Sequence, residues 1–98
     1  MTAKFGSIKQ TEIGTRQFTF NQSVTHTTVN FTRDFSKCSN VYVVASPAGF
    51  LPEEFDDYLP IVGVGSVTTS GFDLMARAVG GAAGYSDIAE INWIAVGI

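Results

Sequence analysis

The chain has few charged side chains, a single cysteine and a single histidine. Charged residues make up 15% of its 98 residues and hydrophobic residues 45%. Soluble domains usually carry roughly 25% charged residues. The sequence also lacks the apolar run of roughly 18 residues that a membrane helix needs. A small domain with so few charges is expected to have much of its surface covered by a partner, and self-association is the simplest way to supply one.

What the sequence lacks also excludes several classes of function. One cysteine cannot form an intrachain disulfide, so the fold is not expected to depend on oxidation. The six Lys and Arg residues form no cluster and the formal net charge is −3, which argues against nucleic acid as a ligand. The residues after Met1 lack the apolar segment of a signal peptide. We therefore expect synthesis in a cytoplasm without Sec-type export, and no membrane insertion.

No arrangement of residues predicts catalysis, and neither a cofactor nor a metal is expected. His26 lies beside threonines in a predicted strand, where a structural hydrogen-bonding role is the usual one; the alternative is a metal shared by copies at a trimer axis. Cys38 is interpreted as an inert thiol, because no catalytic histidine–acid pair accompanies it. Residues 51–60 contain an acidic segment between two prolines, without the spacing of an EF-hand. This segment is predicted to form a short helical or looped cap with a solvated acidic face.

Alternation of apolar and polar residues with a period of two recurs along the chain, whereas helical periodicity is rare. The alternating segments are rich in Val, Thr, Ile and Phe. Ser70-Gly71 is a two-residue hairpin signal between the predicted strands 61–69 and 72–79. The pattern predicts one all-β domain over residues 1–98, an antiparallel β-sandwich of seven short strands. The other predicted strands cover residues 4–10, 16–21, 25–31, 40–46 and 90–97. The continuous apolar run within 40–46 predicts a strand that is buried on both faces.

The last predicted strand is apolar on both of its faces. A strand without a solvated face is either central in the fold or packed against another chain. Trp93, Ile94 and Val96 are therefore predicted to lie in the core or in an interface between subunits. An indole on such a strand is more often a packing residue than a platform for a sugar. The two faces carry Ile91, Trp93 and Ala95, and Ile94, Val96 and Ile98.

Five segments follow one another in a characteristic order: Thr28-Val29-Asn30-Phe31, Phe35, Val41-Tyr42-Val43-Val44, Val67-Thr68-Thr69-Ser70-Gly71-Phe72 and Asn92-Trp93-Ile94-Ala95-Val96-Gly97. This order resembles the H-type lectin domain and the related C-terminal domains of bacteriophage tail fibres and receptor-binding proteins. The resemblance covers roughly residues 6–98, almost the whole chain. It implies a six- to seven-stranded antiparallel sandwich that assembles as a parallel trimer, with sugar bound in grooves between protomers in the lectin members.

The sugar-binding residues of that family have no counterparts at the matching positions. No aromatic–histidine pair follows Gly71-Phe72, and the predicted strand 61–69 has no arginine. No aspartate precedes Asp34. The resemblance therefore implies the fold and the trimer, and it does not carry over the lectin site.

A glycine-rich segment, residues 80–87, is the predicted place of recognition, because loops at the end of a sandwich commonly bind ligands. Tyr85, Ser86 and Asp87 end this segment and carry groups suited to ligand contact. Arg77, on the non-core face of the preceding strand, is predicted to reach the same end. The alternative is an ordinary exposed hairpin loop.

Together these observations predict a non-enzymatic virion protein of a bacteriophage tail or tail appendage. In the first hypothesis a homotrimer binds a glycan or receptor on the host surface through several weak sites at once. In the second, the trimer is a purely structural knob, tip or connector that contacts only other virion or tail proteins. In both cases the protein is made in the cytoplasm of the host bacterium.

Overall fold

The computed structural model describes residues 7–21, 23–47, 58–80 and 86–98, and the account below refers to these ranges. They contain six strands and no helix, so the predicted all-β fold is confirmed. The strands are β1 (Gln10–Asn21), β2 (Thr25–Asn30), β3 (Val41–Pro47), β4 (Tyr58–Gly65), β5 (Gly71–Gly80) and β6 (Ser86–Gly97).

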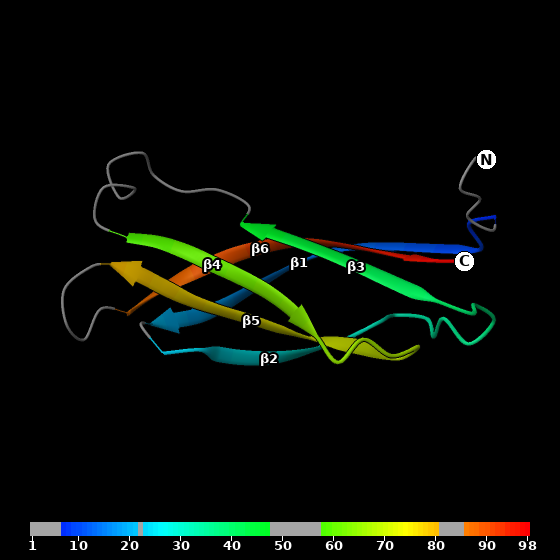
Figure 1. Cartoon of the computed structure of the whole chain (residues 1–98), viewed down its shortest axis with the longest axis horizontal. Coiled ribbons are helices and arrows are strands. Elements are labelled where there is room, and N and C mark those ends of the chain that lie inside the picture. The colour runs from blue at the N-terminus through cyan, green and yellow to red at the C-terminus, as the bar shows by residue number, and fades with distance from the viewer. Residues whose placement is uncertain (1–6, 22, 48–57, 81–85) are drawn as a thin grey trace, which may run out of the picture.

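The strands form two antiparallel three-stranded sheets, in the orders β1-β6-β3 and β2-β5-β4 (Figure 1). The longest pairing joins β1 to β6, from Gln10 opposite Gly97 to Asn21 opposite Ser86. Each sheet therefore combines strands from the two halves of the chain, and neither half makes a sheet by itself. This arrangement puts β6 and β5 at the centres of their sheets, where each strand has a hydrogen-bonded neighbour on both sides.

One apolar core lies between the two sheets and receives side chains from both. Trp93 is only 6% exposed, and its ring centroid lies 5.3 Å from that of Phe72 and 5.9 Å from that of Phe31. Tilted and edge-to-face pairs of this kind add to the stabilisation that burial provides. The core face predicted for the last strand is thus the face that packs inward. The buried residues are Val29, Phe31, Phe35, Phe72, Leu74, Ala76, Ile91, Trp93 and Ala95.

The sequence predicts two short strands, 4–10 and 16–21, where the structure has the single strand β1. It is continuous from Gln10 to Asn21, and residues 7–9 lie outside it. In the first part of the strand the inward positions are Gln10, Glu12 and Gly14, so the apolar alternation that marks a strand is missing there. Gly14 faces Trp93 across the sheet, and a Cβ atom at this position would collide with the indole ring. Ile13, by contrast, points outward and is 73% exposed.

The polar side chains on the inward face of β1 join the two sheets along one edge. The Glu12 carboxylate accepts hydrogen bonds from the backbone N–H of Thr32, at 3.0 and 3.1 Å. Arg16 donates to the hydroxyl of Thr27 on β2, at 3.2 Å. These side chains occupy a position where the core meets solvent, so polar contacts replace apolar packing there. Gln10 adds a third link by donating to the carbonyl of Arg33, at 3.0 Å.

The predicted two-residue hairpin at Ser70-Gly71 is wrong, because residues 66–70 separate β4 from β5. The Thr68 hydroxyl holds this connection by accepting from the N–H groups of Ser70 and Gly71, at 3.2 and 3.3 Å. Gly71 itself belongs to β5, and a Cβ atom there would collide with the carbonyl oxygen of Val29 on β2. The glycine is required for this close approach of two backbones, and it makes no hairpin turn.

Two further predictions concern β3 and the segment before β4. Residues 40–46 were expected to be buried on both faces, but β3 is an edge strand on which Tyr42 and Val44 are 51% and 66% exposed. The predicted cap, residues 51–60, lies outside the described residues up to position 57. Its last three residues open β4, where Pro60 is paired with Ala78. Proline fits this place because β4 is an edge strand.

Candidate functional site

The predicted ligand residues lie toward one end of the molecule but on different sheets. Arg77 is exposed on the outer face of β5, three residues before that strand ends at Gly80. Ser86 and Asp87 open β6, where their backbones pair with β1. Figure 1 shows the end of β5 and the start of β6 at the same end of the protein. Tyr85, and the side chains of Ser86 and Asp87, lie outside the described part of the chain.

The three residues predicted for core or interface divide between the two faces of β6. Trp93 belongs to the core described above. Ile94 points to the opposite, outer face and is 38% exposed, although it lies on the central strand of its sheet. Val96 is half-buried on the same outer face. The outer face of β6 is therefore apolar at Ile94 and Val96, and only the inner face is covered within the described structure.

The outer face of the β1-β6-β3 sheet carries a continuous group of exposed apolar side chains, which we call the apolar stripe. At its centre, Ile13 of β1 and Val44 of β3 lie directly opposite Ile94 of β6, one on each side. Tyr42 of β3 lies opposite Val96 of β6, two residues further along the strand. Patches of this kind on a soluble protein mark surfaces of interaction. The stripe consists of Ile13, Tyr42, Val44, Ile94 and Val96.

Two shallow hollows adjoin the stripe. One, of about 380 Å³, is lined by Ile13, Gly14, Thr15 and Asn92. The hydroxyl of Thr15 and the side-chain oxygen of Asn92 form a hydrogen bond of 2.9 Å beside it. The other, of about 240 Å³, lies between Ile13, Val44 and Ile94. The surface of the stripe is therefore uneven, and side chains of a partner can pack into its hollows.

The outer face of the β2-β5-β4 sheet is chemically different. Its outward positions include His26, Thr28, Asp73 and Arg77, and Thr28 donates to the Asp73 carboxylate at 3.3 Å. On β4 the outward positions next to β5 are glycines, at 63 and 65. This face thus combines polar groups and missing side chains with the apolar side chains of Ile61 and Met75.

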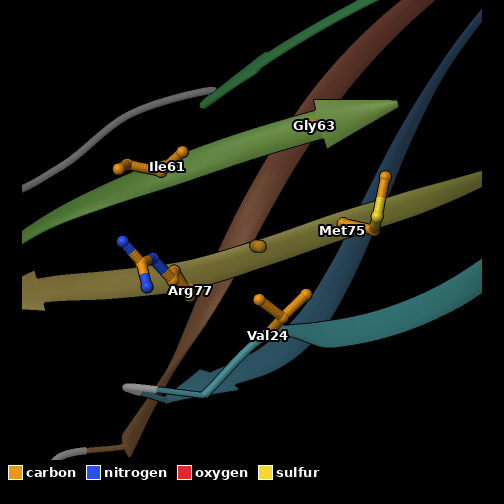
Figure 2. A pocket seen from close by; sticks show the side chains of 6 residues that line it. Val24, Ile61, Gly63, Met75 and Arg77 are labelled. Atoms are coloured by element: carbon orange, nitrogen blue, oxygen red, sulfur yellow. The ribbon is translucent and has the colours of Figure 1, made fainter. Parts of the chain in front are cut away.

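The missing side chains leave a hollow of about 180 Å³ on this second face, which we call the Arg77 hollow. Figure 2 shows Ile61 on β4 and Val24 before β2 on either side of β5, from which Arg77 and Met75 project. The Met75 methyl group lies toward β4, 3.7 Å from the place a Cβ atom on Gly63 would take. The hollow thus has apolar sides and one cationic group. Its lining residues are Val24, Ile61, Gly63, Met75, Ala76 and Arg77.

The residues considered for metal or thiol chemistry are not brought together. His26 is exposed on β2 and lies opposite Met75. Cys38 is half-buried, and a Cβ atom on Gly97 would collide with its sulfur. Within the described ranges, no three His, Cys, Asp or Glu side chains form a group that could hold a metal ion. Among the same residues, no helix is long and apolar enough to cross a membrane.

Sequence reasoning found Arg77 but missed the hollow around it. Residues 61–65 alternate Ile-Val-Gly-Val-Gly, so the inward positions are filled by valine and two outward ones are empty. That alternation is a readable signal of a recess on one face of a strand. The neighbours of the recess depend on strand register, because Ile61 is paired with Arg77 and Gly63 with Met75.

Comparison with known proteins gave no match to a family model, to a curated protein or to a solved structure.

Proposed function

We propose that this chain is a non-enzymatic virion protein of a bacteriophage tail appendage, with an H-type-lectin-like fold. It assembles as a homotrimer and binds a glycan or receptor on the host surface. The proposal combines the order of segments that resembles the H-type lectin domain with one structural observation, the apolar stripe. The protein is made in the host cytoplasm, is incorporated into the virion, and binds neither nucleic acid nor membrane.

The apolar stripe supports self-association because it has the composition of an interface centre. Charged residues are depleted at such centres, and the outward positions on the three strands at the levels of Ile94 and Val96 are uncharged. Three copies that turn this face toward a common three-fold axis would bury the stripe against itself. A trimer also accounts for the apolar outer face of β6, a central strand that no part of the described chain covers.

The outer face of the other sheet supports a role in recognition. In a trimer built through the stripe, this face points away from the axis and stays open to solvent. Its polar side chains and the Arg77 hollow are then displayed in three copies. Three weak sites on one rigid body bind a multivalent cell surface far more tightly than one site does, by a factor of roughly 10²–10⁴.

The purely structural alternative rests on the same stripe, since an exposed apolar surface also fits another virion protein. In this alternative the chain is a knob, tip or connector that makes protein contacts only. It predicts that the purified protein forms a stable stoichiometric complex with a virion component and does not adsorb to host cells.

The assembly is tested by measuring the mass in solution by light scattering for the wild-type chain and two matched variants. We expect a trimer for the wild type, a monomer for Ile94→Glu, and a trimer for the control Ile61→Glu. The control introduces the same charge on the outer face of the opposite sheet, at a side chain that is 51% exposed. Far-UV circular dichroism establishes that each variant is folded. A monomeric wild type, or equal dissociation of both variants, would contradict the proposal.

Recognition is tested separately, by competition for adsorption of the virus to its host cells. An excess of the purified trimer is expected to block adsorption, and a heat-unfolded sample is the control. If the trimer instead co-purifies with virion proteins and leaves adsorption unchanged, the structural alternative replaces receptor binding.

A further inference from the structure

The Arg77 hollow is a shallow, open recess on the outer face of the β2-β5-β4 sheet. Its volume is about 180 Å³, which suits a small ligand such as a single sugar residue. Val24 and Ile61, at 54% and 51% exposure, are raised apolar side chains on either side of β5, and Gly63, next to Ile61 on β4, leaves space beside Met75.

Arg77 is available to a ligand. Within the described ranges its guanidinium donates no hydrogen bond, whereas Arg16 is engaged by Thr27 and by the carbonyl of Thr28. The nearest carboxylate on the same face of β5 belongs to Asp73, four residues away. A strand rises about 3.3 Å per residue, so the two Cα atoms are roughly 13 Å apart. Asp73 is also hydrogen-bonded to Thr28 at 3.3 Å, and it does not neutralise Arg77.

A cation at the rim of an apolar hollow selects a ligand that has both a negative charge and an apolar surface. A guanidinium binds a carboxylate through two parallel N–H···O bonds, a geometry that an ammonium group cannot provide. A pyranose ring offers C–H groups on its faces, which pack against aliphatic side chains such as Ile61 and Met75. A carboxylated sugar ring combines the two features, whereas a free carboxylate or a neutral sugar has only one of them.

We propose that the Arg77 hollow binds a carboxylate-bearing sugar residue, with the carboxylate on Arg77 and the ring over Gly63, against Ile61 and Met75. This inference rests on the proposed function, because it names the ligand class of a receptor-binding surface. The hollow lies on the outer face of the β2-β5-β4 sheet, opposite the apolar stripe, so assembly through the stripe leaves it open. An isolated site this small and shallow binds with a dissociation constant of about 1 mM or weaker, and its use depends on multivalency.

The test is a titration of the full chain, labelled for NMR, with methyl glucuronide. Methyl glucoside has the same ring without the carboxylate, and acetate has the carboxylate without the ring. We expect the amide shifts of Ile61, Met75 and Arg77 to move with the glucuronide, and both partial ligands to bind at least tenfold more weakly. Equal affinity for acetate would overturn the role of the ring, and equal affinity for the glucoside would overturn the role of Arg77.

Two variants of Arg77 and one matched control locate the binding. Arg77→Gln is expected to weaken glucuronide binding at least tenfold, and Arg77→Lys by a smaller factor, because the charge remains while the bidentate geometry is lost. Arg33→Gln removes the same charge from another exposed arginine and is expected to bind as the wild type does. Equal losses in the Arg77→Gln and Arg33→Gln variants would show non-specific attraction and overturn the site.

This experiment separates the inference from the proposed function. A trimer that blocks adsorption to host cells but does not bind glucuronide contradicts the inference alone. A monomer that binds glucuronide at Arg77 supports the hollow and contradicts the assembly.

Discussion

The two outer faces of this protein cover the same core and have opposite chemistry. The face of the β1-β6-β3 sheet presents branched apolar side chains around Ile94. The face of the β2-β5-β4 sheet presents hydrogen-bonded polar groups and a hollow with a cationic rim at Arg77. If both faces were only exposed to solvent, we would expect them to carry similar side chains. In the proposed function, the first face contacts copies of the same chain and the second binds a polar ligand.

The largest effect is expected from a change in the core that both faces share. Trp93→Ala removes a 6% exposed indole that contacts Phe31 and Phe72. Loss of such a side chain from a core costs about 3–5 kcal/mol of unfolding free energy, and both faces should be lost together. Urea unfolding followed by fluorescence of the remaining tyrosines measures the loss. Val67→Ala, in the exposed β4–β5 connection, is the control, with an expected change within about 0.5 kcal/mol. If Val67→Ala destabilised the protein as much as Trp93→Ala does, the core around Trp93 would not be the common support of the two faces.

A smaller change should affect the polar face alone. Gly63→Val places a side chain in the Arg77 hollow, and a Cβ atom at Gly63 meets only the Met75 methyl group at an ordinary 3.7 Å. We expect at least a tenfold loss of glucuronide binding, equivalent to about 1.4 kcal/mol, with the mass in solution unchanged. Val67→Ala is the control, because Val67 is exposed and does not line the hollow. If Gly63→Val dissociates the assembly, the two faces are not independent.

The smallest expected effect concerns the edge where the two sheets meet. Glu12→Gln keeps the shape of the side chain but removes the charge that accepts the two hydrogen bonds from the Thr32 N–H. We expect a loss of about 1 kcal/mol in unfolding free energy, with oligomeric mass and glucuronide binding both unchanged. Differential scanning calorimetry and light scattering measure these quantities. A change in assembly would mean that this edge belongs to the interface, contrary to the division between outer faces.

The prediction from sequence succeeded where a strand has ordinary apolar alternation. The burial of Ile91, Trp93 and Ala95 on one face of β6 follows from their spacing, and the all-β class follows from the frequency of such segments. For β1 this reasoning gave the wrong limits, because Gln10, Glu12 and Gly14 occupy its inward positions. Polar residues point inward there to make hydrogen bonds across the edge, and a glycine admits the Trp93 indole. Such exceptions depend on the partner strand, which a single sequence does not specify.

The candidate site shows the same limit. Arg77 was recognised as a residue on a non-core face, but its neighbours Ile61, on β4, and Val24, just before β2, are placed by a strand register that the sequence leaves open. Gly71 was interpreted as a turn residue, although its function is to let β2 approach β5. Local patterns thus predicted which side chains are exposed, and tertiary pairing determined which of them lie together.

The pairing of β1 with β6 also has a consequence for how the protein folds. Gln10 lies opposite Gly97 and Asn21 opposite Ser86, so the ribosome synthesises β1 long before the strand that it pairs with. Folding must wait for that distant strand, and native contacts of such large sequence separation are associated with slow folding. During this interval β1 is an unpaired strand that presents Ile13, a target for non-native pairing between nascent chains. The polar residues Glu12 and Arg16 on its other face reduce that hazard before they connect the two sheets.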